Sequence, residues 1–129
     1  RDTQMAKRKV TNLTDVSEIT CVVQKGMADE IVQSLLDAGI QGATVHSGVG
    51  TGIRERMGLL GVAVEVEREI VQVLVSKDQV DRIFERMYLA GRLDTPGMGY
   101  IYAAPLVQAA TYIPAHLLED KDSLSSLGV

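Results

Sequence analysis

Two glycine-rich segments are the parts of this sequence best suited to bind a ligand. The first runs from Gly48 to Gly52, and the second is Gly97-Met98-Gly99. Because glycine lacks a Cβ atom, successive backbone N–H groups in such a segment can converge on an anion such as phosphate. The second segment precedes a predicted strand rather than a helix, which excludes a Walker loop and a dinucleotide-binding fingerprint. Spacing alone leaves two interpretations open, phosphate binding and ordinary tight turns.

The stretch from Gly48 to Gly61 is the best candidate for contact with a partner protein. A charged, glycine-hinged loop of this length in a compact domain is usually functional or disordered. Its centre combines charge with apolar anchors, as expected of a segment that becomes ordered on binding. The residues concerned are Arg54, Glu55, Arg56, Met57 and Leu59. Simple disorder is the alternative interpretation.

Metal binding and nucleophilic catalysis have no matching pattern. His46 and His116 are far apart in the chain, and metal-ligand spacings are absent. Cys21 is the only cysteine and lies in an apolar run, which favours a buried, inert thiol. The alternating acidic residues at positions 65–69 are interpreted as the solvent face of a strand. We therefore expect no metal site and no enzymatic activity.

Net charge and hydrophobicity restrict the kinds of partner that the protein can bind and the cellular compartment in which it is expected. The net charge of −4 argues against nucleic acid, because phosphate contacts need a concentrated basic face. No apolar run approaches the ~20 residues that span a bilayer, and no signal-peptide pattern is present. The cytoplasm is the expected compartment, without direct membrane insertion.

The apolar periodicity predicts two strand–helix–strand units. Strands are expected at 19–24, 41–47, 62–75 (half-exposed up to residue 69) and 100–104, and helices at 27–38 and from Ser76 to about Ala90. Ser76 and Gln79 occupy capping-box positions, and Gly39 and Gly91 end the helices. This order predicts an α+β, ferredoxin-like βαββαβ fold, with a four-stranded antiparallel sheet and two helices on one face.

The domain is expected at residues 19–113, between a flexible N-terminal extension at 1–18 and a C-terminal tail at 114–129. The sheet face without helices would expose valines unless it is covered. Oligomerisation is the simplest cover, because no other part of the chain is long enough.

Several stretches resemble the PII nitrogen-regulatory family. The segment Leu35-Leu36-Asp37-Ala38-Gly39-Ile40-Gln41-Gly42-Ala43-Thr44-Val45 is similar to its first-helix end and second strand. Gly48 to Gly52 resembles the base of its T-loop, and Asp78-Gln79-Val80-Asp81 the start of its second helix. Gly91-Arg92 through Gly97-Met98-Gly99-Tyr100-Ile101-Tyr102 resembles its B-loop and the following strand. The resemblance covers about residues 19–113.

The resemblance implies a homotrimeric signal-transduction protein that binds an adenine nucleotide (ATP, ADP or AMP) between subunits. The T-loop base of one subunit, with Gly50 and Gly52, would face the B-loop of the next. The implied B-loop contacts are Arg92, Gly97, Met98 and Gly99, and Thr44 would line the base or ribose. The T-loop-like segment would regulate a target, for example a membrane transporter.

Departures from the family pattern concern the ligand and the regulation. No tyrosine lies between Ser47 and Glu69, where the family usually carries a modified one. Tyr100 replaces a lysine that usually follows the B-loop glycines, and the usual arginine pair after Ala110 is missing. A non-nucleotide interaction module similar to the CutA-type trimers is therefore the alternative function.

Overall fold

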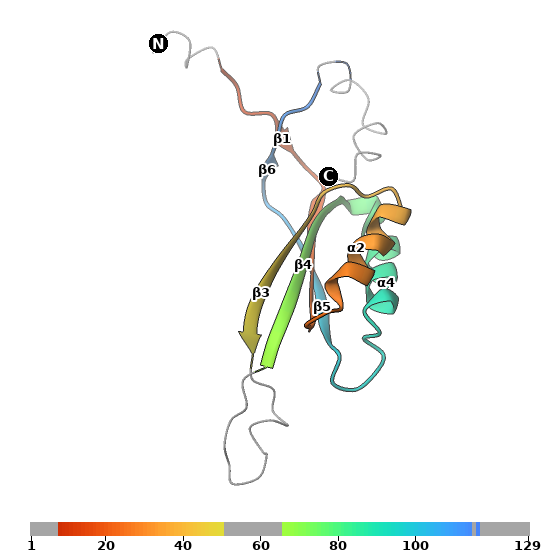
Figure 1. Ribbon diagram of the computed structural model, residues 1–129. Helices are drawn as coiled ribbons and strands as arrows, with labels where there is room; N and C mark the ends of the chain where they lie inside the picture. Colours follow the sequence, from red (N-terminus) through yellow and green to blue (C-terminus); the bar gives the residue numbers. More distant parts are fainter. Residues whose placement is uncertain (1–7, 51–65, 115, 117–129) are drawn as a thin grey trace.

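The computed structural model describes residues 8–50, 66–114 and 116. Its centre is one four-stranded antiparallel sheet in the order β3-β4-β2-β5. These strands are β2 (Val16–Gln24), β3 (Ala43–Gly50), β4 (Val66–Ser76) and β5 (Gly99–Pro105). Both helices, α2 (Ala28–Asp37) and α4 (Val80–Ala90), lie on the same face of the sheet (Figure 1). The predicted ferredoxin-like α+β fold is therefore confirmed.

The main core lies between the sheet and the two helices. Its largest fully buried side chains include Ile19 and Val71 of the central strands, Ile31 of α2, and Ile83 of α4. Cys21 belongs to the same core, and burial raises the pKa of its thiol to about 11. The prediction of a buried thiol is confirmed.

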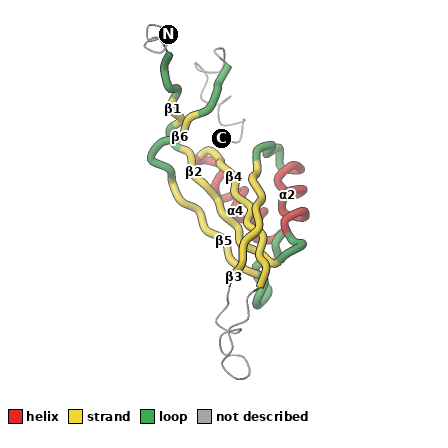
Figure 2. Tube along the Cα trace, turned by 60° about the vertical axis from the view of Figure 1, so that its left-hand side comes forward, coloured by secondary structure: helices red, strands yellow, loops and turns green. Residues whose placement is uncertain are grey.

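A second, smaller core lies at one end of the sheet and involves the expected N-terminal extension. The short strand β1 (Asn12–Leu13) pairs with β6 (Ala109–Ala110), as Figure 2 shows. Leu13 and Val16 are buried against Ile113. The expectation of a flexible extension up to residue 18 is therefore wrong for residues 12–13 and 16–18, because these residues pair with other strands, and Leu13 and Val16 are buried.

The helix ends differ in detail from the prediction. Gly39 has the predicted left-handed backbone, with φ of 87°. Ser76 does not cap α4: its hydroxyl donates to Asp78, and the 3-10 turn η2 (Lys77–Gln79) precedes the helix. At the other end Gly91 keeps helical backbone angles, and Arg92, with φ of 56°, is the left-handed residue.

Candidate functional site

Three connections meet at one end of the sheet, which we call the loop end. They are the β2–α2 turn, the ends of β3 and β4, and the loop of residues 91–98 between α4 and β5 (Figure 1). The Gln24 side chain donates a hydrogen bond to the Gly97 carbonyl at 3.0 Å, which joins the first connection to the third. An open hollow of about 470 Å³ is lined by Gln24, Lys25, Val66 and Glu67. The loop end thus combines a concave surface with glycine-bearing backbone.

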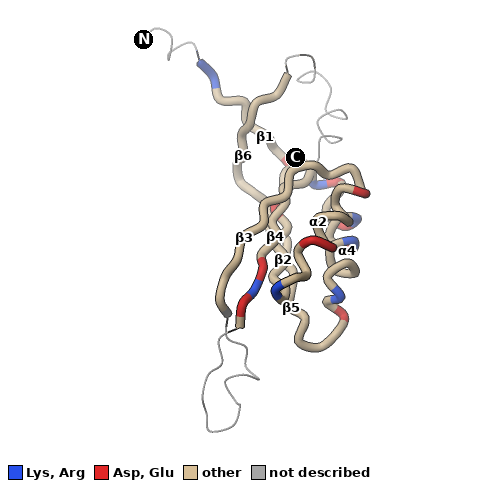
Figure 3. The backbone as a smooth tube through the Cα atoms, in the orientation of Figure 1, with Lys and Arg blue, Asp and Glu red and all other residues tan. Residues whose placement is uncertain are grey.

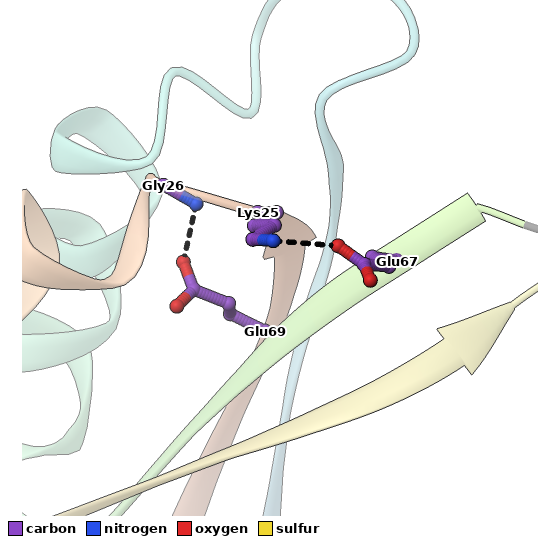
Figure 4. A network of polar contacts seen from close by, with 4 residues as sticks. All are labelled: Lys25, Gly26, Glu67 and Glu69. Atoms are coloured by element: carbon purple, nitrogen blue, oxygen red, sulfur yellow. Dashed lines mark hydrogen bonds and ion pairs between the residues drawn. The ribbon is translucent and has the colours of Figure 1, made fainter.

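A polar network connects the β2–α2 turn and the start of α2 to the first residues of strand β4 (Figure 4). Glu69 accepts hydrogen bonds from the backbone N–H groups of Gly26, at 2.6 Å, and Ala28, at 3.2 Å. This carboxylate therefore caps the positive N-terminal end of α2, whose own first turn offers no side-chain cap. Lys25 Nζ lies 2.9 Å from Glu67 Oε2. That hydrogen bond, together with the charge of Glu67, raises the pKa of Lys25.

The interpretation of these acidic residues as a solvent face is thus wrong for Glu69. The register pairs Glu69 with Val23, whose side chain is fully buried in the main core. Residues at alternate positions of a strand share a face, so Glu69 lies on the helix side with Val71. This alternation was a signal in the sequence, because positions 67 and 69 continue the apolar series 71, 73 and 75.

The two predicted B-loop glycines, Gly97 and Gly99, differ in why the structure needs a glycine at each position. Gly99 has φ of 136°, and a Cβ there would overlap the Val22 carbonyl oxygen. Gly99 therefore allows β5 to pack closely against β2. Gly97 has φ of 82°, and a Cβ there would meet nothing within 4 Å. The backbone hydrogen bonds of this loop, as far as the chain is described, do not use the Gly97 N–H, so it remains the better candidate for binding an anion.

Arg92 and Met98 occupy the two ends of the same loop. The Arg92 side chain is exposed and lies 4.0 Å from Glu30, the outer limit of an ion pair. The loop itself is built from turns, in which Thr95 N donates to Arg92 O at 3.0 Å and Met98 N donates to Thr95 O at 3.3 Å. Met98 is partly buried. These two turns thus hold Arg92 and Met98 in one short loop with Gly97.

The remaining predicted nucleotide contacts lie apart from this loop within one chain. Thr44 is exposed on the helix-free face, opposite Gln72, and six residues before Gly50, which is roughly 20 Å along a strand. Gly50 ends β3 at the loop end, but β3 and β5 are opposite edges of the sheet, roughly 14 Å apart. Gly52 lies outside the described residues, as do the partner-contact candidates Arg54, Glu55, Arg56, Met57 and Leu59.

Two further features of the helix-free face were not predicted as a group. Tyr100 and Tyr102 stack along β5, with ring centroids 6.4 Å apart and an interplanar angle of 19°. His46 Nε2 lies 3.2 Å from Gln72 Oε1 and the residue is exposed, as expected of a surface histidine. Aromatic residues at i and i+2 in a strand were the available signal for the tyrosine pair.

Comparison with known proteins defines the family. The model of the family "Nitrogen regulatory protein P-II" matches residues 16–114. The chain belongs to the PII family. PII proteins are signalling regulators, and this chain is accordingly a PII-like signalling protein. None of the curated proteins compared with the chain matches it.

A solved PII structure has the same fold. The crystal structure of Arabidopsis thaliana PII bound to citrate superimposes with a TM-score of 0.57 and 22% sequence identity, covering 72% of this chain and 78% of that chain. At this identity the likeness supports the fold alone. Within residues 8–50, 66–114 and 116, no group of three or more His, Cys, Asp or Glu side chains is placed to hold a metal ion. Nor does any helix there have the length and hydrophobicity to cross a membrane.

Proposed function

We propose that this PII protein forms a homotrimer in the cytoplasm and binds an adenine nucleotide (ATP, ADP or AMP) between its subunits. The bound nucleotide regulates a target protein, for example a membrane transporter, through the segment between β3 and β4. In this proposal the protein has no catalytic activity of its own. The nucleotide biases the segment by binding one of its arrangements more tightly than the other.

The observation that carries the proposal is the placement of Gly50 and Gly97 at one end but at opposite edges of the sheet. In a single chain two strands, β4 and β2, lie between them, so a ligand that contacts both needs a second copy. Neighbouring copies that meet edge to edge would bring β3 of one against β5 of the next. The Gly97 backbone, left-handed and open to solvent, is suited to receive a phosphate there.

Isothermal titration of the full chain with ATP, ADP and AMP tests the proposal. Arg92→Ala should weaken nucleotide binding about tenfold, since a charge-assisted hydrogen bond contributes about 1.5–3 kcal/mol. Gly97→Val should abolish binding by blocking the approach of the phosphate. Because valine is strained at positive φ, Gly97→Asn is the matched variant: asparagine tolerates this backbone but still fills the space. Lys77→Ala, at the other end of the sheet, should bind like the parent.

Undiminished binding by the Arg92 and Gly97 variants would place the ligand elsewhere. Light scattering that shows a stable monomer at micromolar concentration would contradict the site between subunits. No detectable binding by the parent would favour the alternative, a non-nucleotide trimeric module of the CutA type. One observation favours that alternative: Lys25 and Arg92 are both already paired with carboxylates.

A further inference from the structure

The tyrosine pair on β5 stands directly beside the loop of residues 91–98. The register places Tyr100 opposite Val22 and Tyr102 opposite Thr20, on the face of the sheet away from the helices. In the single chain the two residues are 60% and 48% exposed, and they lie on β5, an edge strand of the sheet. Near-parallel rings two residues apart follow one another along the strand, and Tyr100 is therefore the ring on the loop side.

Tyr100 is close enough to Gly97 for one small ligand to contact both. Three residues of extended chain span at most about 10 Å, which is comparable to the length of a nucleoside monophosphate. The Gly97 N–H and the Tyr100 ring offer complementary chemistry, a donor for an anion and a flat aromatic face for a base. Stacking on an exposed aromatic ring is one way in which proteins hold unpaired bases, because every base has a flat aromatic face.

Charged residues of both signs lie near the loop end of the sheet (Figure 3). In the described ranges the cations at this end are Lys25, Arg68 and Arg92, and the carboxylates are Asp29, Glu30, Glu67, Glu69 and Asp94. Carboxylates therefore outnumber cations there. Each added phosphate brings further negative charge close to these carboxylates, and salt screens the repulsion between them only partly.

We infer that Tyr100 holds the base of the bound nucleotide by stacking, and that the site prefers a nucleoside monophosphate to a triphosphate. The inference rests on the proposed function and extends it to the residue that holds the base and to the charge of the ligand. Tyr102 stacks on the other face of the Tyr100 ring and does not contact the ligand.

Calorimetric titration with AMP, ATP and ribose 5-phosphate, which lacks the base, tests this assignment. Tyr100→Leu should weaken AMP binding about tenfold or more, which corresponds to the about 1–3 kcal/mol that stacking of one base contributes. It should leave the affinity for ribose 5-phosphate unchanged. Tyr100→Phe keeps the aromatic face and should bind AMP within about threefold of the parent. AMP should bind the parent more tightly than ATP, and Tyr102→Leu should have a smaller effect than Tyr100→Leu.

The outcomes separate this inference from the proposed function. If Gly97→Asn loses AMP but Tyr100→Leu binds it as tightly as the parent, the nucleotide site stands and the Tyr100 assignment falls. Tighter binding of ATP than of AMP would overturn the charge argument. If Tyr100→Leu dissociates the oligomer in light scattering and loses AMP and ribose 5-phosphate equally, the pair belongs to a subunit contact and the inference is overturned. A parent that binds no nucleotide removes both proposals.

Discussion

Replacing Gly99 by alanine should destabilise the protein far more than the same change at Gly97. An added Cβ at Gly99 would overlap the Val22 carbonyl oxygen and lie 3.0 Å from its carbonyl carbon, whereas one at Gly97 meets nothing within 4 Å. Paired strands lie about 4.8 Å apart, and β5 must move away from β2 by about 1 Å to accept the methyl group. A backbone bond of about 2.9 Å stretched by that amount is lost.

The two changes therefore differ in free energy of unfolding. Losing two or three ladder bonds at about 1 kcal/mol each, plus backbone strain, predicts a loss of about 3–4 kcal/mol for Gly99→Ala. Gly97→Ala pays the strain of its left-handed backbone alone, about 1–2 kcal/mol. Urea unfolding followed by circular dichroism, at equal subunit concentration, measures both. A loss for Gly99→Ala no greater than for Gly97→Ala would refute the reasoning.

Two further predictions concern groups in the strands. Glu69→Gln should lower the free energy of unfolding by about 1 kcal/mol, because it removes the charge that caps α2. Glu67→Gln, at an exposed ion pair, should cause no measurable loss in the same urea assay. Equal effects of the two variants would contradict the capping role of Glu69. Burial raises the pKa of Cys21 from 9.0 to about 11, so the thiol of the unfolded chain ionises first, and the free energy of unfolding should fall by about 2 kcal/mol as the pH rises from 9 to 11. In Cys21→Ala the free energy of unfolding should fall less between pH 9 and pH 11. The same fall as in the parent would show that the thiol does not cause it.

Most of the fold could be predicted because burial follows the period of each element. The helix α2 has Ile31 and Leu35 one turn apart and facing the sheet, and β4 alternates buried valines with partly exposed residues. The N-terminal strand was missed because Asn12–Leu13 is only two residues long. Its pairing partner lies almost a hundred residues further along the chain, and so short a segment has no period of its own.

The candidate site was predictable only in part. Gly97 and Arg92 were predicted as ligand contacts from glycine spacing and from the resemblance, and the structure places both in the loop between α4 and β5. The capping role of Glu69 depends on the register between β2 and β4, which local patterns do not define. That Thr44 and Gly97 are far apart within one chain depends on strand order, which is likewise a property of the whole sheet.

The β2–α2 turn contacts both the loop of residues 91–98 and the start of β4. Gln24 donates to the Gly97 carbonyl on one side, and the next residue, Lys25, pairs with Glu67 just after the segment between β3 and β4 on the other. A phosphate bound at the Gly97 N–H would contact the same residue whose carbonyl accepts the hydrogen bond from Gln24. In the proposed regulator, nucleotide binding would reach the start of β4 through these two adjacent residues, if it favours one of their arrangements over another.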